Sequence, residues 1–211
     1  MKKKCTYIVL EGLDGSGKTT LFNNLNSFFV KDNISFQTLC PTRICSPNSI
    51  LEKIYRANKI FKKINFCRTI IFAYRSYKSS RQTNWNSDLV FGDRSIIVSY
   101  VKHWRKYFNS PFLSVALVNF IEPFIKTPDF VLLLDAPENI LIKRLALKDI
   151  IEVDETPENL RLMKNAYKEI RYCYKISRLA KIKWIDIDSN KSPSVLANEV
   201  YQIIKNILNN K

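Results

Sequence analysis

The stretch from Gly12 to Thr19 is the part of the chain best suited to chemistry. It fits the pattern G-x-x-x-x-G-K-[ST] at every fixed position, after an apolar run at 7–10 and before a segment with helical spacing of apolar residues. A glycine-rich turn between a strand and a helix surrounds phosphate groups with backbone N–H groups and with the positive end of the helix dipole. The pattern therefore predicts that the chain binds a nucleoside triphosphate.

Two side chains of this turn have expected tasks of their own. Lys18 can reach the β- and γ-phosphates, and the hydroxyl group of Thr19 can bind Mg²⁺. The backbone and the other side chains complete the cradle. We expect nucleotide contacts from Gly12, Leu13, Asp14, Gly15, Ser16, Gly17, Lys18, Thr19 and Thr20.

Charged residues also follow two other predicted strands. Asp93 and Arg94 follow the strand predicted at 88–92, and Arg43 lies in a proline-bounded loop after the strand predicted at 35–39. In a parallel sheet, ligands bind at the carboxyl ends of the strands, so we expect these residues to share one site with the phosphate loop. Asp93 would help to hold Mg²⁺, while Arg94 and Arg43 would bind a phosphate group. Arg43 could instead be an ordinary surface residue.

The fourth predicted strand, at 130–134, ends at Asp135. This carboxylate is the alternative to Asp93 beside the metal, and it could also cap the next helix. His103 is the only histidine of the chain, and we expect it on a helix surface without a catalytic role.

Two further groups of residues suit binding of a nucleotide. Phe72 and Arg75 are three apart on a helix predicted at 66–77, so they share a face that could contact a base, although Phe72 could instead be core. Arg144 lies near the end of another predicted helix, before an acidic and irregular segment. We expect a lid at about 144–157 that closes over the triphosphate, with Arg144 neutralising charge. The alternative is a cation placed favourably at a helix C-terminus.

Composition excludes several classes of protein. The 211 residues are 46% hydrophobic and 25% charged, as in a folded protein, with a net charge of +15. That charge favours anionic partners, although scattered lysines indicate a solvated surface more than a nucleic-acid face. Five cysteines without a C-x-x-C pair argue against a zinc site and against a disulfide framework. We expect a cytoplasmic protein that neither crosses nor binds a membrane.

Predicted strands alternate with predicted helices along the whole chain. After the strands already named, a fifth is predicted at 183–187, and the main helices at 96–108, 112–121, 158–179 and near 195–207. Such alternation predicts an α/β fold with a parallel sheet between two layers of helices. No repeat or linker divides the chain, so we expect a single domain over 1–211.

The motifs together resemble those of the thymidylate kinase family. The sequence from Tyr7 to Thr20 is similar to the opening of these enzymes, and Thr42-Arg43, Gly92-Asp93-Arg94 and the segment 128–135 follow in the family's order. The resemblance covers nearly the whole chain. It implies a three-layer P-loop kinase fold with a five-stranded parallel sheet, and transfer of the γ-phosphate of ATP to dTMP or a related deoxynucleoside monophosphate. It also implies a homodimer.

Carried over to this chain, the resemblance assigns a role to each candidate residue. Lys18 and Thr19 would serve ATP and Mg²⁺, and Asp93 would organise the metal and the acceptor. Arg43 and Arg94 would hold the acceptor phosphate, and Phe72 and Arg75 would face the thymine. The catalytic set would be Lys18, Asp93, Arg94 and Arg144.

The acceptor half of the site departs from the family's pattern. Phe72 and Arg75 are three apart where the family usually has a spacing of four, and the run after Arg94 lacks the family's glutamine and alanine-tyrosine. Two alternatives stay open. One is a deoxynucleoside kinase that acts on the free nucleoside, with Glu11 or Asp93 as general base. The other is a catalytically degenerate relative that binds nucleotide or nucleic acid through its positive charge.

Overall fold

A five-stranded, all-parallel sheet forms the centre of the protein. The computed structural model describes residues 5–41, 43, 47–104, 110–147, 156–173 and 178–210. The strand order is β2-β3-β1-β4-β5. The strands are β1 (Thr6–Gly12), β2 (Phe36–Leu39), β3 (Leu89–Asp93), β4 (Phe130–Asp135) and β5 (Lys183–Asp188). The predicted three-layer α/β fold with five parallel strands is confirmed.

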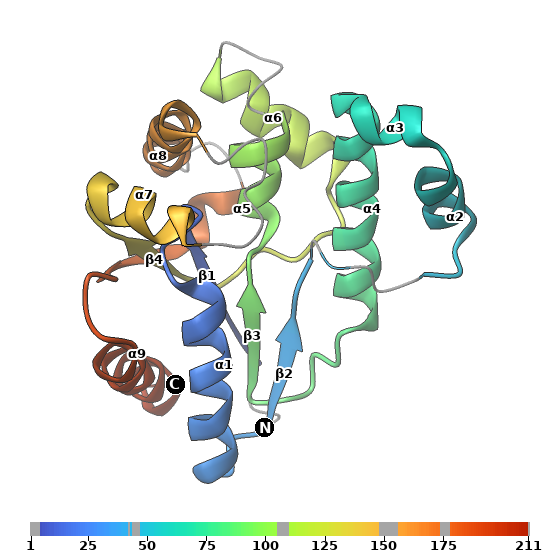
Figure 1. Ribbon diagram of the computed structural model, residues 1–211. Coiled ribbons are helices and arrows are strands. Elements are labelled where there is room, and N and C mark those ends of the chain that lie inside the picture. Colours follow the sequence, from blue (N-terminus) through green and yellow to red (C-terminus); the bar gives the residue numbers. More distant parts are fainter. Residues whose placement is uncertain are drawn as a thin grey trace.

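Alternate residues of β1 pack into separate cores on the two faces of the sheet. Ile8 and Leu10 lie in the core that includes apolar residues of α1 (Lys18–Lys31) and α9 (Pro193–Asn209). Tyr7 and Val9 lie in the other core, formed with helices that Figure 1 shows on the opposite side of the sheet. These are α5 (Ile96–Val98), α6 (Pro111–Ile121), α7 (Glu138–Ala146) and α8 (Pro157–Cys173). Full burial of one such aliphatic side chain contributes about 1.5–3 kcal/mol, so β1 is anchored on both faces.

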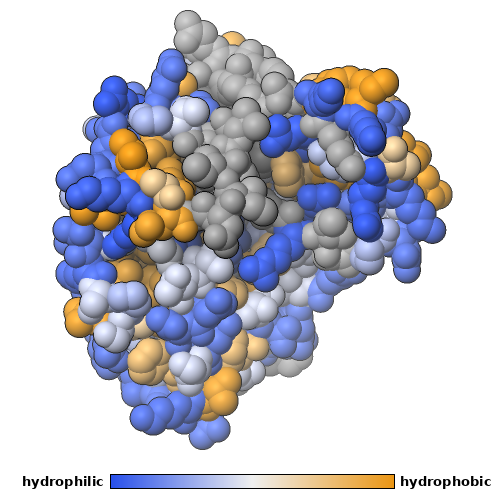
Figure 2. All heavy atoms as spheres, in the orientation of Figure 1, coloured by the Kyte–Doolittle hydropathy of each residue, from blue (hydrophilic) through white to orange (hydrophobic). Residues whose placement is uncertain are grey.

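Helices between β2 and β3 build one side of the molecule. They are α2 (Ile50–Ala57), α3 (Lys59–Lys63) and α4 (Asn65–Gln82). Asn58 separates α2 from α3 because its side chain accepts hydrogen bonds from the backbone N–H groups of Ile60 and Phe61, which caps a new helix. Figure 2 shows a largely hydrophilic face, with hydrophobic residues over α2 and α3 at the right and others near α7 at the left. In the part of the chain that the structure describes, no helix is long and apolar enough to cross a membrane.

Two predicted helices differ from those observed. The helix expected at 96–108 ends as α5 at Val98, and a π-helical turn follows over Ser99–Trp104. Of the helix expected at 158–179, α8 covers the part up to Cys173, whereas residues 178 and 179 lie in a 3₁₀ turn, Arg178–Lys181, before β5. Arg178 donates hydrogen bonds to the carbonyl groups of Pro123 and Ile125 after α6. Such tertiary contacts override local helical propensity, which is the physical reason for the second difference.

Candidate active site

The phosphate loop joins β1 to α1 at the carboxyl edge of the sheet. Gly12 has φ 142°, and a Cβ atom there would lie 2.3 Å from the carbonyl oxygen of Leu134 on β4. Gly17 has φ 86° and is the N-cap of α1, with open space around it. Glycine is thus required at Gly12 for close packing, and at Gly17 for a left-handed turn that leaves room for a ligand.

We expect Gly12→Ala to destabilise the protein by about 2–4 kcal/mol, since backbone strain and a clash with main-chain atoms act together. Gly17→Ala is the matched control, because only the positive φ penalises it, by about 1–2 kcal/mol. Urea unfolding followed by circular dichroism measures both. Equal losses of stability in the two variants would contradict the packing role of Gly12.

Lys18 is buried beneath the loop. Its side-chain amino group donates hydrogen bonds to the carbonyl oxygen of Leu13 at 2.5 Å and to Ser16 Oγ at 3.2 Å. Burial, and after it the positive charge of Arg94, lowers the pKa of Lys18 to about 7. An anionic ligand here would supply the negative charge that a buried ammonium group lacks.

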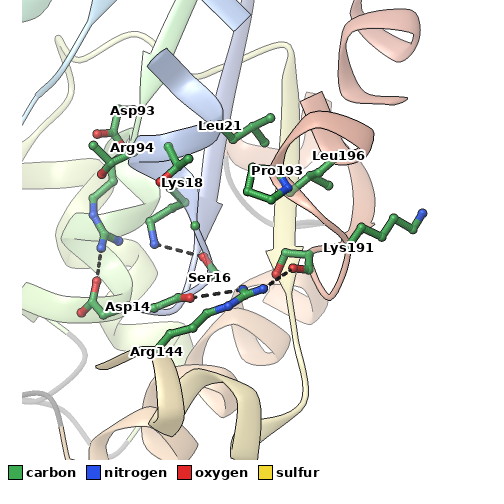
Figure 3. Close-up of a pocket in the computed structure, with 15 residues that line it drawn as sticks. Asp14, Ser16, Lys18, Leu21, Asp93, Arg94, Arg144, Lys191, Pro193 and Leu196 are labelled. Carbon is green, nitrogen blue, oxygen red and sulfur yellow. Dashed lines mark hydrogen bonds and ion pairs between the residues drawn. The ribbon is translucent and has the colours of Figure 1, made fainter. Parts of the chain in front are cut away.

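Arg94 faces the loop from the end of β3. Its backbone has φ 73°, outside the range usual for a side-chain-bearing residue, and its N–H donates to the carbonyl oxygen of Leu10 at 3.0 Å. The side chain is 13% exposed, and Nη2 donates to Asp14 Oδ1 at 2.5 Å, as Figure 3 shows. Nη1 is buried and has no hydrogen-bond partner among the described residues. A buried guanidinium nitrogen without a partner is costly unless an anionic ligand completes it.

Asp14 forms ion pairs with two side chains, Arg94 and Lys102. Of these two, only Arg94 was expected in the site from sequence. Arg94 occupies its Oδ1 atom, and Lys102 donates to Oδ2 at 2.5 Å from the π-helical turn. Burial alone would raise the pKa of Asp14, but Arg94 and Lys102 outweigh burial and hold it well below its usual range. Asp14 is therefore a carboxylate over the whole neutral range of pH.

Two oxygen donors suited to Mg²⁺ accompany Lys18 in this part of the site. Thr19 is exposed at the first turn of α1, and Asp93 ends β3 with its side chain 16% exposed. Both residues line the same cavity. A hydroxyl group and one carboxylate, supplemented by phosphate oxygens and water, form the kind of ligand set that Mg²⁺ prefers in phosphotransfer sites. These two residues therefore fit the ion.

Arg43 approaches this group from the loop after β2. Its Nη2 atom lies 4.0 Å from Asp93 Oδ2, and its side chain is 63% exposed. At that distance and exposure the pair contributes little to stability, so Arg43 is available for a ligand.

Glu11, the last residue before Gly12, lies completely buried. Its Oε1 atom accepts hydrogen bonds from the backbone N–H and the hydroxyl group of Ser95, both at 2.8 Å, and Oε2 accepts one from Tyr167 at 2.9 Å. Burial raises the pKa of Glu11. Because both oxygens have partners, Glu11 links the phosphate loop to the Arg94 segment and to α8, a role that sequence reasoning missed.

These elements surround a cavity of about 410 Å³. Figure 3 shows Asp14, Lys18 and Arg94 on one side of it and Arg144 of α7 on another. Arg144 donates to the carbonyl oxygens of Ser189 at 3.0 Å and of Gly15 at 3.5 Å. The cavity brings together these predicted residues: Asp14, Gly15, Ser16, Gly17, Lys18, Thr19, Thr20, Asp93, Arg94 and Arg144.

The far end of the cavity was not anticipated from sequence. The segment between β5 and α9, and α9 itself, contribute Ser189, Lys191, Pro193 and Leu196 to its lining. The available signal was the position of this segment directly after the fifth predicted strand, at the edge of the sheet where ligands bind. A partly apolar wall beside a phosphate loop suits a nucleobase.

Comparison with known proteins agrees with this geometry. A family model described as thymidylate kinase matches residues 10–200. This chain belongs to the thymidylate kinase family. It is therefore a kinase, a phosphotransferase built on a nucleotide-binding fold.

Individual relatives match over most of their length. The probable thymidylate kinase of Picrophilus torridus is 28% identical over 207 residues, 96% of each chain. That of Methanobrevibacter smithii is 27% identical over 150 residues, 71% of this chain and 73% of the relative. A solved thymidylate kinase structure from Candida albicans has a TM-score of 0.68 at 16% identity, and the match covers 99% of this chain and 94% of that one. The last comparison shows the fold.

The residues expected to face the base lie outside the cavity lining described above. Phe72 and Arg75 are neighbours on α4, with the guanidinium carbon 5.3 Å from the ring centre. Arg75 also forms a two-point ion pair with buried Glu52 of α2, at 2.6 Å and 3.1 Å. That Phe72 and Arg75 contact thymine in this thymidylate kinase family member stays a prediction. Most of the expected lid, residues 148–155, lies outside the described part of the chain.

Proposed function

We propose that the protein transfers the γ-phosphate of ATP to dTMP, giving ADP and dTDP. The observation that carries this proposal is the buried Nη1 atom of Arg94, which has no hydrogen-bond partner among the described residues. Arg94 lines the same cavity as the phosphate loop. A triphosphate on the loop and a monophosphate on Arg94 would place two phosphate groups against one another. Membership in the thymidylate kinase family supports dTMP as the acceptor.

In the reaction, an oxygen of the dTMP phosphate attacks the γ-phosphorus atom, and the bond from that phosphorus to the β-phosphate oxygen breaks. The dTMP phosphate is already ionised at neutral pH, so no general base is needed. Lys18, Arg94 and Arg144 provide fixed positive charge around the transferred group, and Arg43 approaches the acceptor side. Mg²⁺, held through Thr19 and Asp93, would neutralise charge on the β- and γ-phosphates.

An acceptor panel tests the proposal. We expect dTMP to be phosphorylated and thymidine to react at least about 10²-fold more slowly, because a free hydroxyl group needs a general base. Glu11, one candidate for that base, has both oxygens engaged. Release of ADP in a coupled assay, with nucleoside monophosphates and nucleosides compared at equal concentration, measures the difference. Phosphorylation of thymidine without phosphorylation of dTMP would overturn the proposal.

The same panel addresses the degenerate-relative alternative. Absence of ATP consumption with every acceptor, together with steeply salt-dependent binding of DNA or RNA, would favour it. We do not favour it, because a simple binding module has no need of both an intact phosphate loop and an unpartnered Arg94 nitrogen. The net charge of +15 alone does not distinguish a nucleotide site from a nucleic-acid surface.

We also propose a homodimer that forms through α4 and α6. Helix α6 contains no charged residue and exposes Phe112, Leu113 and Phe120. The ring of Phe124, just after α6, lies 6.5 Å from that of Tyr77 on α4, so the exposed apolar surface continues from one helix to the other. Surfaces of this kind mark protein contacts. Sedimentation velocity measures the assembly, and a monomer at micromolar concentration would contradict it. A cytoplasmic location stays a prediction from sequence.

A further inference from the structure

Lys102 contacts the phosphate-binding machinery without lining its cavity. Its ammonium nitrogen lies 2.5 Å from Asp14 Oδ2, and the two side chains are 23% and 13% exposed. Lys102 belongs to the run where this chain departs from the family's sequence pattern. None of the chemistry proposed above requires it.

The turn that carries Lys102 is firmly anchored. Ser99 donates a hydrogen bond to Glu122 at 3.0 Å, and the buried Tyr100 donates one to Glu169 of α8 at 3.1 Å. The turn is π-helical, a geometry that is rare in proteins and occurs frequently at functional sites. These two hydrogen bonds hold the turn in place, and with it the ammonium group of Lys102 beside Asp14.

Asp14 contacts both Arg94 and Lys102, one with each carboxylate oxygen. Arginine and carboxylate groups pair best in a two-point arrangement, in which two guanidinium nitrogens meet two oxygens. Here Arg94 uses only Nη2, on Oδ1, while Lys102 donates to Oδ2. Nη1 of Arg94 is buried and has no hydrogen-bond partner in the described part of the chain.

We infer that Lys102 is a positioning residue: by occupying one oxygen of Asp14, it prevents a two-point Asp14–Arg94 pair and reserves a guanidinium nitrogen for the acceptor phosphate. The inference rests on the proposed function for the identity of that phosphate. Without Lys102, Asp14 competes with the acceptor for Arg94. With Lys102, Asp14 orients Arg94 through a single contact and leaves its other nitrogen available.

The test compares Lys102→Met, which keeps the length of the side chain and removes its charge, with the wild type. We expect the KM for dTMP to rise about tenfold or more, as for the loss of one charge-assisted contact, while kcat at saturating dTMP changes by less than about threefold. Lys102→Arg should retain most of the affinity, since it retains the cation. Lys205→Met is the matched control, because Lys205 of α9 pairs with Asp32, just after α1, at 2.8 Å, and neither residue lines the cavity.

A double-mutant cycle shows whether Lys102 acts through Asp14. In an Asp14→Asn background, Lys102→Met should produce no further rise in KM, because the competing carboxylate is gone. Independent, additive effects would overturn the inference, and so would an unchanged KM in Lys102→Met.

Calorimetric binding of dTMP and of inorganic phosphate separates this inference from the proposed function. A wild-type protein that binds phosphate but not dTMP contradicts the proposed acceptor. Equal phosphate affinity of the wild type and Lys102→Met contradicts the role of Lys102. Weaker phosphate binding by Lys102→Met, with thermal unfolding unchanged, supports that role whichever nucleotide is the acceptor.

Discussion

Replacing Lys18 by alanine is expected to lower kcat by on the order of 10²–10³, comparable to the loss of one preorganised electrostatic donor in other enzymes. The reason lies in the position of the ammonium group, which is buried under the phosphate loop and held by Leu13 and Ser16. There it needs no reorganisation when charge develops on the transferred phosphoryl group. Initial rates at saturating ATP and dTMP measure the effect. A variant within about threefold of the wild type would remove Lys18 from the mechanism, since that difference is below 1 kcal/mol.

The pKa of Lys18 provides a second readout of the same change. Burial, followed by the charge of Arg94, lowers this pKa to about 7, so above that pH the free protein carries the amine largely neutral. Phosphate groups of ATP favour the charged form and raise the pKa again. Binding of ATP at about pH 8 should therefore take up a proton, detectable by calorimetry in buffers of different ionisation enthalpy. Lys18→Ala should abolish this uptake, while uptake that persists in the variant assigns the proton to another group.

The donor half of the site could be predicted from sequence because its geometry is local. The backbone between Gly12 and Thr19 forms the phosphate cradle. The glycines that allow this backbone conformation occur at a fixed spacing in the sequence. Asp93 and Arg94 could be placed as well, since they follow an apolar run that reads as a strand. The carboxyl ends of parallel strands meet at one edge, so the convergence of these residues on one cavity followed from the strand assignments.

The remaining contacts depend on distances that sequence patterns do not encode. Glu52 of α2 forms an ion pair with Arg75 of α4. Lys102 donates a hydrogen bond to Asp14, which lies 88 positions earlier in the sequence. The π-helical turn that carries Lys102 reads in sequence as ordinary helix, because its apolar spacing is similar. The wall formed by Ser189 and Pro193 depends on where α9 returns to the sheet. These contacts come from tertiary packing.

Arg94→Ala is expected to lower kcat/KM for dTMP by about 10²–10³, because truncation removes a desolvated charge that pairs with Asp14 and, in the proposed function, with the acceptor phosphate. Affinity for ATP should change by less than about threefold, since the backbone N–H groups and Lys18 of the phosphate loop are retained. Calorimetry with ATP and steady-state kinetics with varied dTMP separate the two effects. A parallel loss of ATP affinity would place Arg94 on the donor side of the cavity instead.

Arg94→Lys distinguishes the geometry of Arg94 from its charge. A lysine in this position keeps the cation but lacks the second nitrogen. It therefore cannot hold Asp14 with one nitrogen, as Nη2 does, and offer another to a phosphate, as proposed for Nη1. We expect kcat/KM of Arg94→Lys to exceed that of Arg94→Ala by no more than about tenfold, because lysine can restore one charge-assisted hydrogen bond at most. Arg161→Ala is the matched control, because Arg161 pairs with Glu138 on the surface at 2.8 Å with its side chain 70% exposed. Full recovery by lysine would show that charge alone suffices, and the division of Arg94 between Asp14 and the acceptor would then be wrong.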